Sequence, residues 1–217
     1  MEPFPRADER SRMVEQQIRA RGITNPRVLD AMREIPRHLF VPPPYTLSAY
    51  TDSPLPIGNG QTISQPYIVA LMTALLETRS EDRVLEIGTG CGYQAAILAR
   101  LVCHVTTIER IHAVADLAWK NIASLGLKNV SIIVGDGTEG YIQNAPYNGI
   151  IITAATPQIP PPLIDQLDEG GILVAPVGGR DIQELITLKK HHGRTDQLSH
   201  GGVRFVPLIG EHGWTDT

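Results

Sequence analysis

Residues 83–93 read Arg83-Val84-Leu85-Glu86-Ile87-Gly88-Thr89-Gly90-Cys91-Gly92-Tyr93. The segment opens with a short apolar run typical of a buried strand, and its glycines then alternate as G-x-G-x-G before a helical pattern begins. Glycines let the backbone approach a ligand closely. In open α/β sheets the ligand lies outside the carboxyl ends of the strands, near the first strand-to-helix turn. This segment therefore predicts a ligand site at residues 88–92.

The alternation of strands and helices continues toward the C-terminus. The apolar pattern predicts strands at 83–87, 104–108, 130–134, 149–153 and 172–177, and helices at 93–101, 111–125 and 162–167. Two further strands, 184–189 and 203–208, follow with no helix between them. Strand–helix alternation indicates a parallel sheet covered on both faces. We predict an α/β, Rossmann-like, doubly wound, mostly parallel sheet with an antiparallel edge hairpin and an N-terminal helical extension.

The N-terminal third is predicted to be helical and irregular. Asp8 can cap a helix that ends at Gly22, and Asn25 followed by Pro26 is a cap and first-turn pair for a second helix. Residues 41–56 contain five prolines and are expected to form an ordered loop, and a helix is predicted at 67–77. The whole chain, 1–217, is predicted to be one domain, with an N-terminal extension at 1–80 and a cofactor-binding α/β core at 81–217.

The composition of the 217 residues is that of a globular protein, with 42% hydrophobic and 19% charged residues. The net charge of −4 gives no reason to expect a nucleic-acid partner. The stretch Met1–Arg6 lacks an apolar leader, and no run is long enough to cross a membrane. The two cysteines, Cys91 and Cys103, have no metal-ligand spacing and are expected to be reduced thiols. We expect a cytoplasmic monomer without a metal.

Acidic residues follow the first strands at positions that suit an adenosine ligand. Glu109 comes after the second core strand, where a carboxylate can accept ribose hydroxyls, and Asp136-Gly137 comes after the third, near the expected adenine edge. Glu86 could face an amino group of the ligand. The dinucleotide fingerprint G-x-G-x-x-G is absent because Tyr93 replaces its third glycine. An adenosine ligand without phosphates fits best, and S-adenosylmethionine is the commonest cofactor of that kind.

Val84–Tyr93 resembles the first motif of class I methyltransferases. Other segments are similar to the protein-L-isoaspartate O-methyltransferase family in particular, and the most specific of these is Gly60-Gln61-Thr62-Ile63-Ser64-Gln65-Pro66. The resemblance extends to Ala49-Tyr50, Pro54–Gly58, Arg37–Pro42, Val134–Gly137, Pro176–Gly179 and Arg204–Leu208. It runs from about Met13 to Leu208, nearly the whole chain.

This resemblance implies a protein-repair enzyme that transfers a methyl group from S-adenosyl-L-methionine to the α-carboxylate of L-isoaspartyl residues, leaving S-adenosyl-L-homocysteine. The methyl ester would close to a succinimide, whose hydrolysis returns some aspartate. Damaged proteins and peptides would be the partners. The resemblance implies Ser64 as the catalytic residue, and Ile57, Thr62 and Val206 as substrate-binding residues. The expected cofactor-binding residues are Gln61, Thr62, Ile63, Ser64, Glu86, Gly88, Thr89, Gly90, Gly92, Glu109, Asp136 and Gly137.

Other interpretations of these residues remain open at this point. Ser64 could simply cap the helix that contains Pro66. The segment 153–155 could line the cofactor pocket or only pack closely. For the chain as a whole, the rivals are a small-molecule methyltransferase, a non-enzymatic nucleotide-binding module and a nicotinamide-dependent oxidoreductase. The first has no reason to carry residues 57–66, and Tyr93 disfavours the last.

Overall fold

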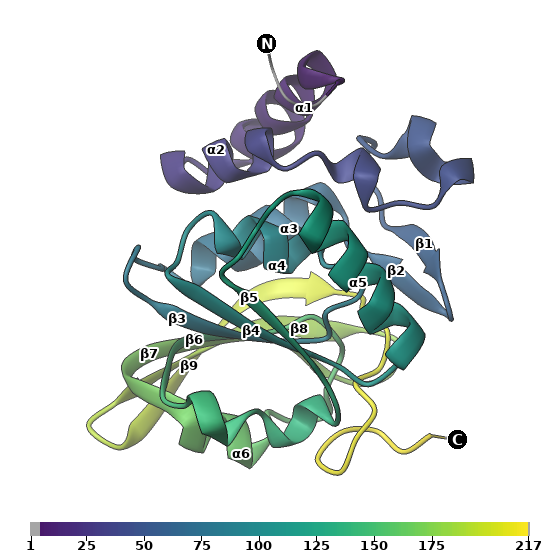
Figure 1. Cartoon of the computed structure of the whole chain (residues 1–217). Helices are drawn as coiled ribbons and strands as arrows, with labels where there is room; N and C mark the ends of the chain where they lie inside the picture. The colour runs from purple at the N-terminus through teal and green to yellow at the C-terminus, as the bar shows by residue number, and fades with distance from the viewer. Residues whose placement is uncertain (1–4, 217) are drawn as a thin grey trace.

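A computed structural model of the chain describes residues 5–216 (Figure 1). Residues 1–4, which make up most of the N-terminal stretch Met1–Arg6, and residue 217 lie outside the described residues. The centre of the molecule is a seven-stranded sheet with the order β5-β4-β3-β6-β7-β8-β9. Its strands are β3 (Arg83–Ile87), β4 (His104–Glu109), β5 (Val130–Val134), β6 (Tyr147–Ile152), β7 (Leu167–Gly178), β8 (Gln183–His191) and β9 (Arg194–Val203).

Strands β3 to β7 run parallel, whereas β8 is antiparallel to β7 and β9 is antiparallel to β8. The predicted fold class, a mostly parallel sheet with an antiparallel edge, is confirmed. The chain fills the sheet outward from β3 through β4 to β5, and then returns to the other side of β3 with β6 and β7. The carboxyl ends of β3 and β6 therefore flank the point where the strand order reverses, which is where open α/β sheets bind their ligands.

Helices cover both faces of the sheet. Figure 1 shows α3 (Pro66–Leu75), α4 (Tyr93–Ala99) and α5 (His112–Ser124) on one side and α6 (Pro161–Gln166) on the other. Every residue of α4 is buried, because this helix lies between the sheet and the N-terminal extension. Short 3₁₀ helices occupy Arg37–Leu39, Pro43–Ser48, Gly137–Glu139 and Ile142–Asn144. Within residues 5–216, no helix is both long and apolar enough to cross a bilayer.

The first part of the N-terminal extension packs on α3 and α4 rather than on the sheet (Figure 1). Its helices α1 (Ala7–Met13) and α2 (Pro26–Glu34) contribute Met13 and Leu29 to the apolar cluster that also contains Leu98 of α4. The cap predicted for α2 is confirmed, since the Asn25 side chain accepts from the N–H groups of Arg27 and Val28.

The predicted start of the first helix is wrong. The helix begins at Ala7 after Arg6, whose φ is 68°, so Asp8 lies inside the first turn instead of capping it. An acid in the first turn still interacts favourably with the helix dipole. Beyond Met13 the helix widens to a π-helix, Val14–Ile18, and ends in a 3₁₀ turn, Arg19–Arg21, before Gly22.

The proline-rich segment before the core contains a hairpin that the sequence did not predict. Strands β1 (Leu55–Gly58) and β2 (Gln61–Ile63) pair antiparallel, and they are joined by Asn59 and Gly60, whose φ angles of 51° and 71° suit a tight two-residue turn. The sequence does not predict β1 because it contains Pro56 and Gly58, and both residue types are unusual in strands. The hairpin carries Gln61 and Ile63 to the edge of the ligand site.

The last strand was predicted at 203–208, which is wrong because β9 spans Arg194–Val203. A tight turn at His192 and Gly193, with φ of 49° and 68°, joins β8 to β9, and nearly all of β9 is exposed, so it has no apolar alternation. Residues 204–209, here called the crossing segment, run from the carboxyl end of β9 past the carboxyl ends of the parallel strands to Ala155, just after β6. There the Ala155 N–H donates to the Val206 carbonyl and the Leu208 N–H donates to the Ala155 carbonyl, both at 2.7 Å.

Candidate active site

The glycine turn after β3 depends on backbone conformations that favour glycine. Gly88, Gly90 and Gly92 have φ of 94°, 55° and 87°, all in the left-handed region. The N–H groups of Gly88 and Thr89 both donate to the carbonyl of Ile108 at the end of β4, at 2.9 and 3.2 Å. The alternating glycines are therefore required by the shape of the turn itself.

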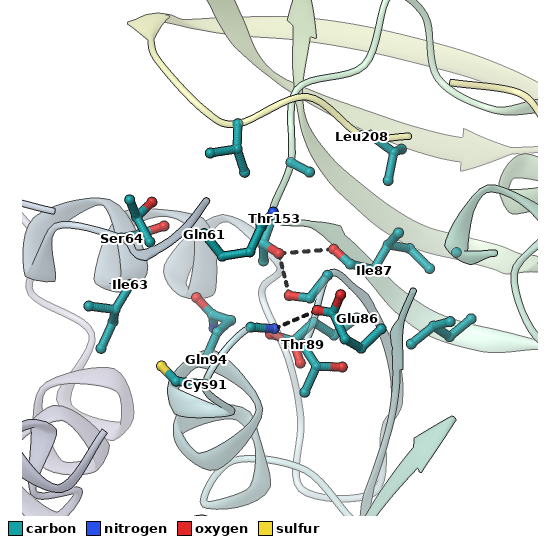
Figure 2. A pocket seen from close by; sticks show the side chains of 18 of the residues that line it. Gln61, Ile63, Ser64, Glu86, Ile87, Thr89, Cys91, Gln94, Thr153 and Leu208 are labelled. Carbon is teal, nitrogen blue, oxygen red and sulfur yellow. Dashed lines mark hydrogen bonds between the residues drawn. The ribbon is translucent and has the colours of Figure 1, made fainter. Parts of the chain in front are cut away.

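Thr153, the first residue after β6, clamps this turn from the other side. Its hydroxyl lies 2.9 Å from the Ile87 carbonyl oxygen and 2.6 Å from that of Gly88, as the dashed lines in Figure 2 show. A Cβ atom at Gly88 would lie 2.5 Å from the Thr153 Oγ1, so Thr153 leaves room only for glycine at position 88. Both interpretations of residues 153–155 apply. Thr153 and Ala154 line the cavity at the carboxyl ends of the strands, whereas Ala155 is buried and packs beside Pro207.

Glu109 lies at the end of β4 and connects the glycine turn to the segment that follows β4. Its two carboxylate oxygens accept hydrogen bonds from the backbone N–H groups of Gly90 and Ile111, each at 3.0 Å. Each oxygen keeps a second lone pair that a ligand hydroxyl could use. The predicted position of this acid at a strand end beside the turn is confirmed.

Glu86 is the next-to-last residue of β3, and its side chain is fully buried. Its Oε2 accepts from the Thr107 hydroxyl at 2.6 Å, and Thr89 bonds the same hydroxyl at 2.7 Å. No residue among 5–216 gives its Oε1 a hydrogen-bond partner. The pKa of Glu86 is raised to about 8, chiefly by burial; the Thr107 bond lowers it and the nearby Glu109 charge adds to the rise. An unpaired oxygen of this kind indicates a polar ligand group beside it.

Asp136 does not line the cavity, although its neighbour Gly137 does. Its carboxylate accepts from the N–H and hydroxyl of Thr138 at 2.8 and 2.7 Å, and from the N–H of Glu211 at 2.7 Å. Burial opposes ionisation, but these bonds outweigh it and hold the pKa of Asp136 below its usual value. Asp136 thus attaches the C-terminal segment to the end of β5.

A cavity lies at the carboxyl ends of β3, β4 and β6, and it gathers most of the predicted site residues. Figure 2 shows Gln61, Ile63 and Ser64 approaching from the hairpin side, with Glu86 and Thr89 across from them and Leu208 from the crossing segment. The predicted residues that line it are Gln61, Thr62, Ile63, Ser64, Glu86, Gly88, Thr89, Gly90, Glu109, Gly137 and Val206. Besides Asp136, two predicted residues lie outside this lining: Ile57, whose side chain faces Gly90, and Gly92, which packs against α5.

The cavity has further lining residues that sequence reasoning missed. Tyr93 and Gln94 reach it from the start of α4, and Leu208 and Ile209 reach it from the crossing segment. Tyr93 and Gln94 could have been predicted because they directly follow the glycine turn. Leu208 and Ile209 could not, because the strand predicted at 203–208 gives no reason to bring them to the carboxyl ends of β3 and β6.

A second, more open groove of about 780 Å³ adjoins the cavity. Four residues, Thr62, Ser64, Thr153 and Val206, line both spaces. The two spaces therefore meet at these side chains. Ser64 stands at the junction and not at the helix cap, because the N-cap position of α3 is Gln65 and the described residues show no side-chain capping bond there.

The sequence profile of the Protein-L-isoaspartate(D-aspartate) O-methyltransferase family matches residues 8–213. The chain belongs to this family. It is 62% identical to the protein-L-isoaspartate O-methyltransferase of Methanoregula boonei over 98% of each chain, and 60% identical to that of Methanoculleus marisnigri over 99% of this chain and 97% of the relative. Membership confirms the predicted S-adenosylmethionine-dependent methyltransferase of isoaspartyl residues in proteins.

Solved structures agree with this family assignment. A protein-L-isoaspartate O-methyltransferase with 28% identity superimposes with a TM-score of 0.86 over 96% of this chain and 67% of its own. A Plasmodium falciparum protein solved in complex with S-adenosyl-L-homocysteine has a TM-score of 0.80 at 24% identity, over 92% of this chain and 98% of its own, and so supports the fold.

Proposed function

We propose that the cavity at the glycine turn holds S-adenosylmethionine, that the adjoining groove holds the isoaspartyl residue, and that the methyl group passes between them at Thr62, Ser64, Thr153 and Val206. The observation that carries this proposal is that these four residues line both spaces. A direct methyl transfer needs the donor methyl group and the acceptor oxygen held close together and in line, and adjoining spaces that meet at the same residues allow this.

The cofactor residues are assigned by the chemistry of their groups. The unpaired oxygen of Glu86 suits the ammonium group of the cofactor, and the free lone pairs of Glu109 suit the ribose hydroxyls. The apolar side chains of Ile87, Ile108 and Leu208 suit the adenine. Gln61, Thr62, Ile63 and Ser64 close the cavity from the hairpin side. When bound, the cofactor supplies an electrophilic methyl group on a sulfonium.

The acceptor side works by positioning and desolvation rather than by proton abstraction. A peptide α-carboxylate has a pKa of about 3.5, so it is ionised at neutral pH and needs no general base. The Thr62 and Ser64 side chains and the Val206 backbone would orient it at the junction, and Ser64 is the proposed catalytic residue. Orientation can contribute up to about 7–11 kcal/mol in model reactions. The methyl ester then closes to a succinimide without the enzyme, and hydrolysis returns some aspartate.

Three expectations about the cellular setting belong to the same proposal. The enzyme acts as a monomer, because one chain carries both the cavity and the groove. It acts in the cytoplasm without a nucleic-acid partner. The free state of both cysteines, Cys91 and Cys103, and the net charge of −4 support these expectations.

The decisive experiment is methyl transfer from labelled S-adenosylmethionine to an isoaspartyl peptide and to its twin with normal aspartate. We expect label in the isoaspartyl peptide alone, as a base-labile ester. Equal labelling of the twins, or none of either, would overturn the proposal. A thermal shift with S-adenosylhomocysteine but not with NAD checks the cofactor separately.

A further inference from the structure

The adjoining groove has an apolar wall that the chemistry at the junction does not need. On one side, Tyr67, Ile68 and Leu71 of α3 point into it from one face of the helix. On the other side stand Ile182, Val203 and Phe205. All of these except Ile182 also pack against the main apolar cluster. The groove thus extends the hydrophobic interior outward from Thr62 and Ser64.

Ile182 is the unusual member of this wall. It belongs to the turn between β7 and β8, and its side chain is 72% exposed, so the fold gains little from an isoleucine there. An exposed large apolar side chain that lines a groove next to a reaction site indicates contact with a ligand.

Charge at the rim of the groove is mixed and does not favour one sign. Arg21 lies over the Tyr67 ring at 3.4 Å and is paired with Asp52 at 3.0 Å, which closes one end of the wall. Arg204 and Asp181 contribute opposite charges to the lining, and His200 is bonded to Thr187 at 3.0 Å. The apolar wall therefore distinguishes ligands better than the charges do.

We propose that Tyr67, Ile68 and Leu71, together with Ile182, Val203 and Phe205, form a hydrophobic subsite for an apolar side chain near the isoaspartyl residue in the substrate polypeptide. This inference rests on the proposed function, because the occupant follows from the continuity of the groove with the junction at Ser64 and Val206. The enzyme would then prefer damaged segments that carry apolar neighbours.

The test uses isoaspartyl peptides that differ only by leucine or serine at positions within two residues of the damage. In the wild-type enzyme, the best-placed leucine should lower KM about tenfold with little change in kcat, since partial burial of a leucine accounts for a factor of that size. Ile182→Ser should reduce this preference to about threefold or less.

Leu198→Ser is the matched control, because Leu198 is an exposed apolar residue of β9, 63% accessible, that does not line the groove. It should leave the tenfold preference intact. Equal KM for the leucine and serine peptides, or full preference in Ile182→Ser, overturns the inference. A dimer of the wild type that Ile182→Ser abolishes would assign the wall to a second copy and would also overturn it. Absence of any methylation would instead count against the proposed function.

Discussion

Glu86 combines an acidic group with complete burial, and its ionisation is therefore linked to folding. Burial raises its pKa to about 8, whereas an unfolded chain loses the proton near pH 4.5. Between these values the folded state binds more protons than the unfolded state. The stability that this group contributes is therefore fully present below about pH 4.5 and is lost as pH rises through about 8.

Glu86→Gln removes this ionisation, so the variant should gain stability relative to wild type as pH rises from 5 to 8. The expected gain is at most about 1.4 kcal/mol per pH unit. Urea unfolding at pH 5, 6.5 and 8 measures it. The same variant should bind S-adenosylhomocysteine more weakly at pH 8, where the wild-type carboxylate can pair with the ligand's ammonium group. A difference in unfolding free energy between the variant and wild type that does not change with pH would contradict the raised pKa of Glu86.

Ser64 is proposed to orient the acceptor, and it does not cap α3. Ser64→Ala should therefore lower kcat/KM for an isoaspartyl peptide about tenfold, the effect of one hydrogen bond to a charged group. The melting temperature and its shift with S-adenosylhomocysteine should stay within the range of Ser124→Ala, a control at an exposed hydroxyl that bonds the Asn121 carbonyl. A large loss of stability in Ser64→Ala would show a structural role instead.

At the scale of elements, the glycine turn is held in place by hydrogen bonds to the end of β4 and to the residue after β6. The Ile108 carbonyl accepts hydrogen bonds from the N–H groups of the turn, and the Thr153 hydroxyl donates to the Ile87 and Gly88 carbonyls. The site therefore depends on the relative position of three strand ends. This explains why one substitution just after β6 should affect cofactor binding at β3.

Thr153→Val keeps the volume of the side chain but removes the hydroxyl from the Ile87 and Gly88 carbonyls. We expect a loss of about 1–2 kcal/mol in stability and a weaker affinity for S-adenosylhomocysteine, measured by calorimetry. Thr51→Val is the control, because Thr51 also bonds a carbonyl, that of Ser48, but it is exposed and lines neither the cavity nor the groove. If both variants bind the ligand like wild type, the clamp has no functional role.

The elements also show which parts of the fold the sequence could predict. Strands β3, β6 and the centre of β7 were predictable because they are buried and carry continuous apolar runs, and the half-buried β5 because its residues are mostly β-branched. Strand β9 was not, because its exposed residues lack any alternation and its pairing depends on the turn at His192 and Gly193. In the site, Glu86, Gly88 and Glu109 follow from strand ends, whereas Leu208 reaches the site through packing between distant segments.

At the scale of the molecule, one apolar cluster joins the N-terminal extension to the α/β core. Met13 and Leu29 from the extension pack in the same cluster as Leu98 and Val174. We therefore propose that residues 1–80 and 81–217 form one domain and unfold together, although they differ in secondary structure.

Leu29→Ala tests this proposal, because Leu29 is fully buried in the extension while both tryptophans, Trp119 and Trp214, belong to the core. The substitution should cost about 2–5 kcal/mol and should lower the midpoints of tryptophan fluorescence and far-UV circular dichroism equally. Leu47→Ala, at a side chain 90% exposed, should change neither. A fluorescence midpoint that stays at the wild-type value would reveal two independent units.

The groove beside Ser64 has walls on both sides, α3 on one and the β7–β8 turn with the end of β9 on the other. In the arrangement proposed above, an isoaspartyl residue at Ser64 brings the polypeptide on either side of it between these walls. A damaged residue within a folded protein must therefore first detach from its own structure. The rate of repair then depends on the opening free energy of each client protein, which ranges from near zero at frayed termini to the full unfolding free energy in a core. Damage at loosely held sites is repaired first, and damage in a stable core waits for that core to open.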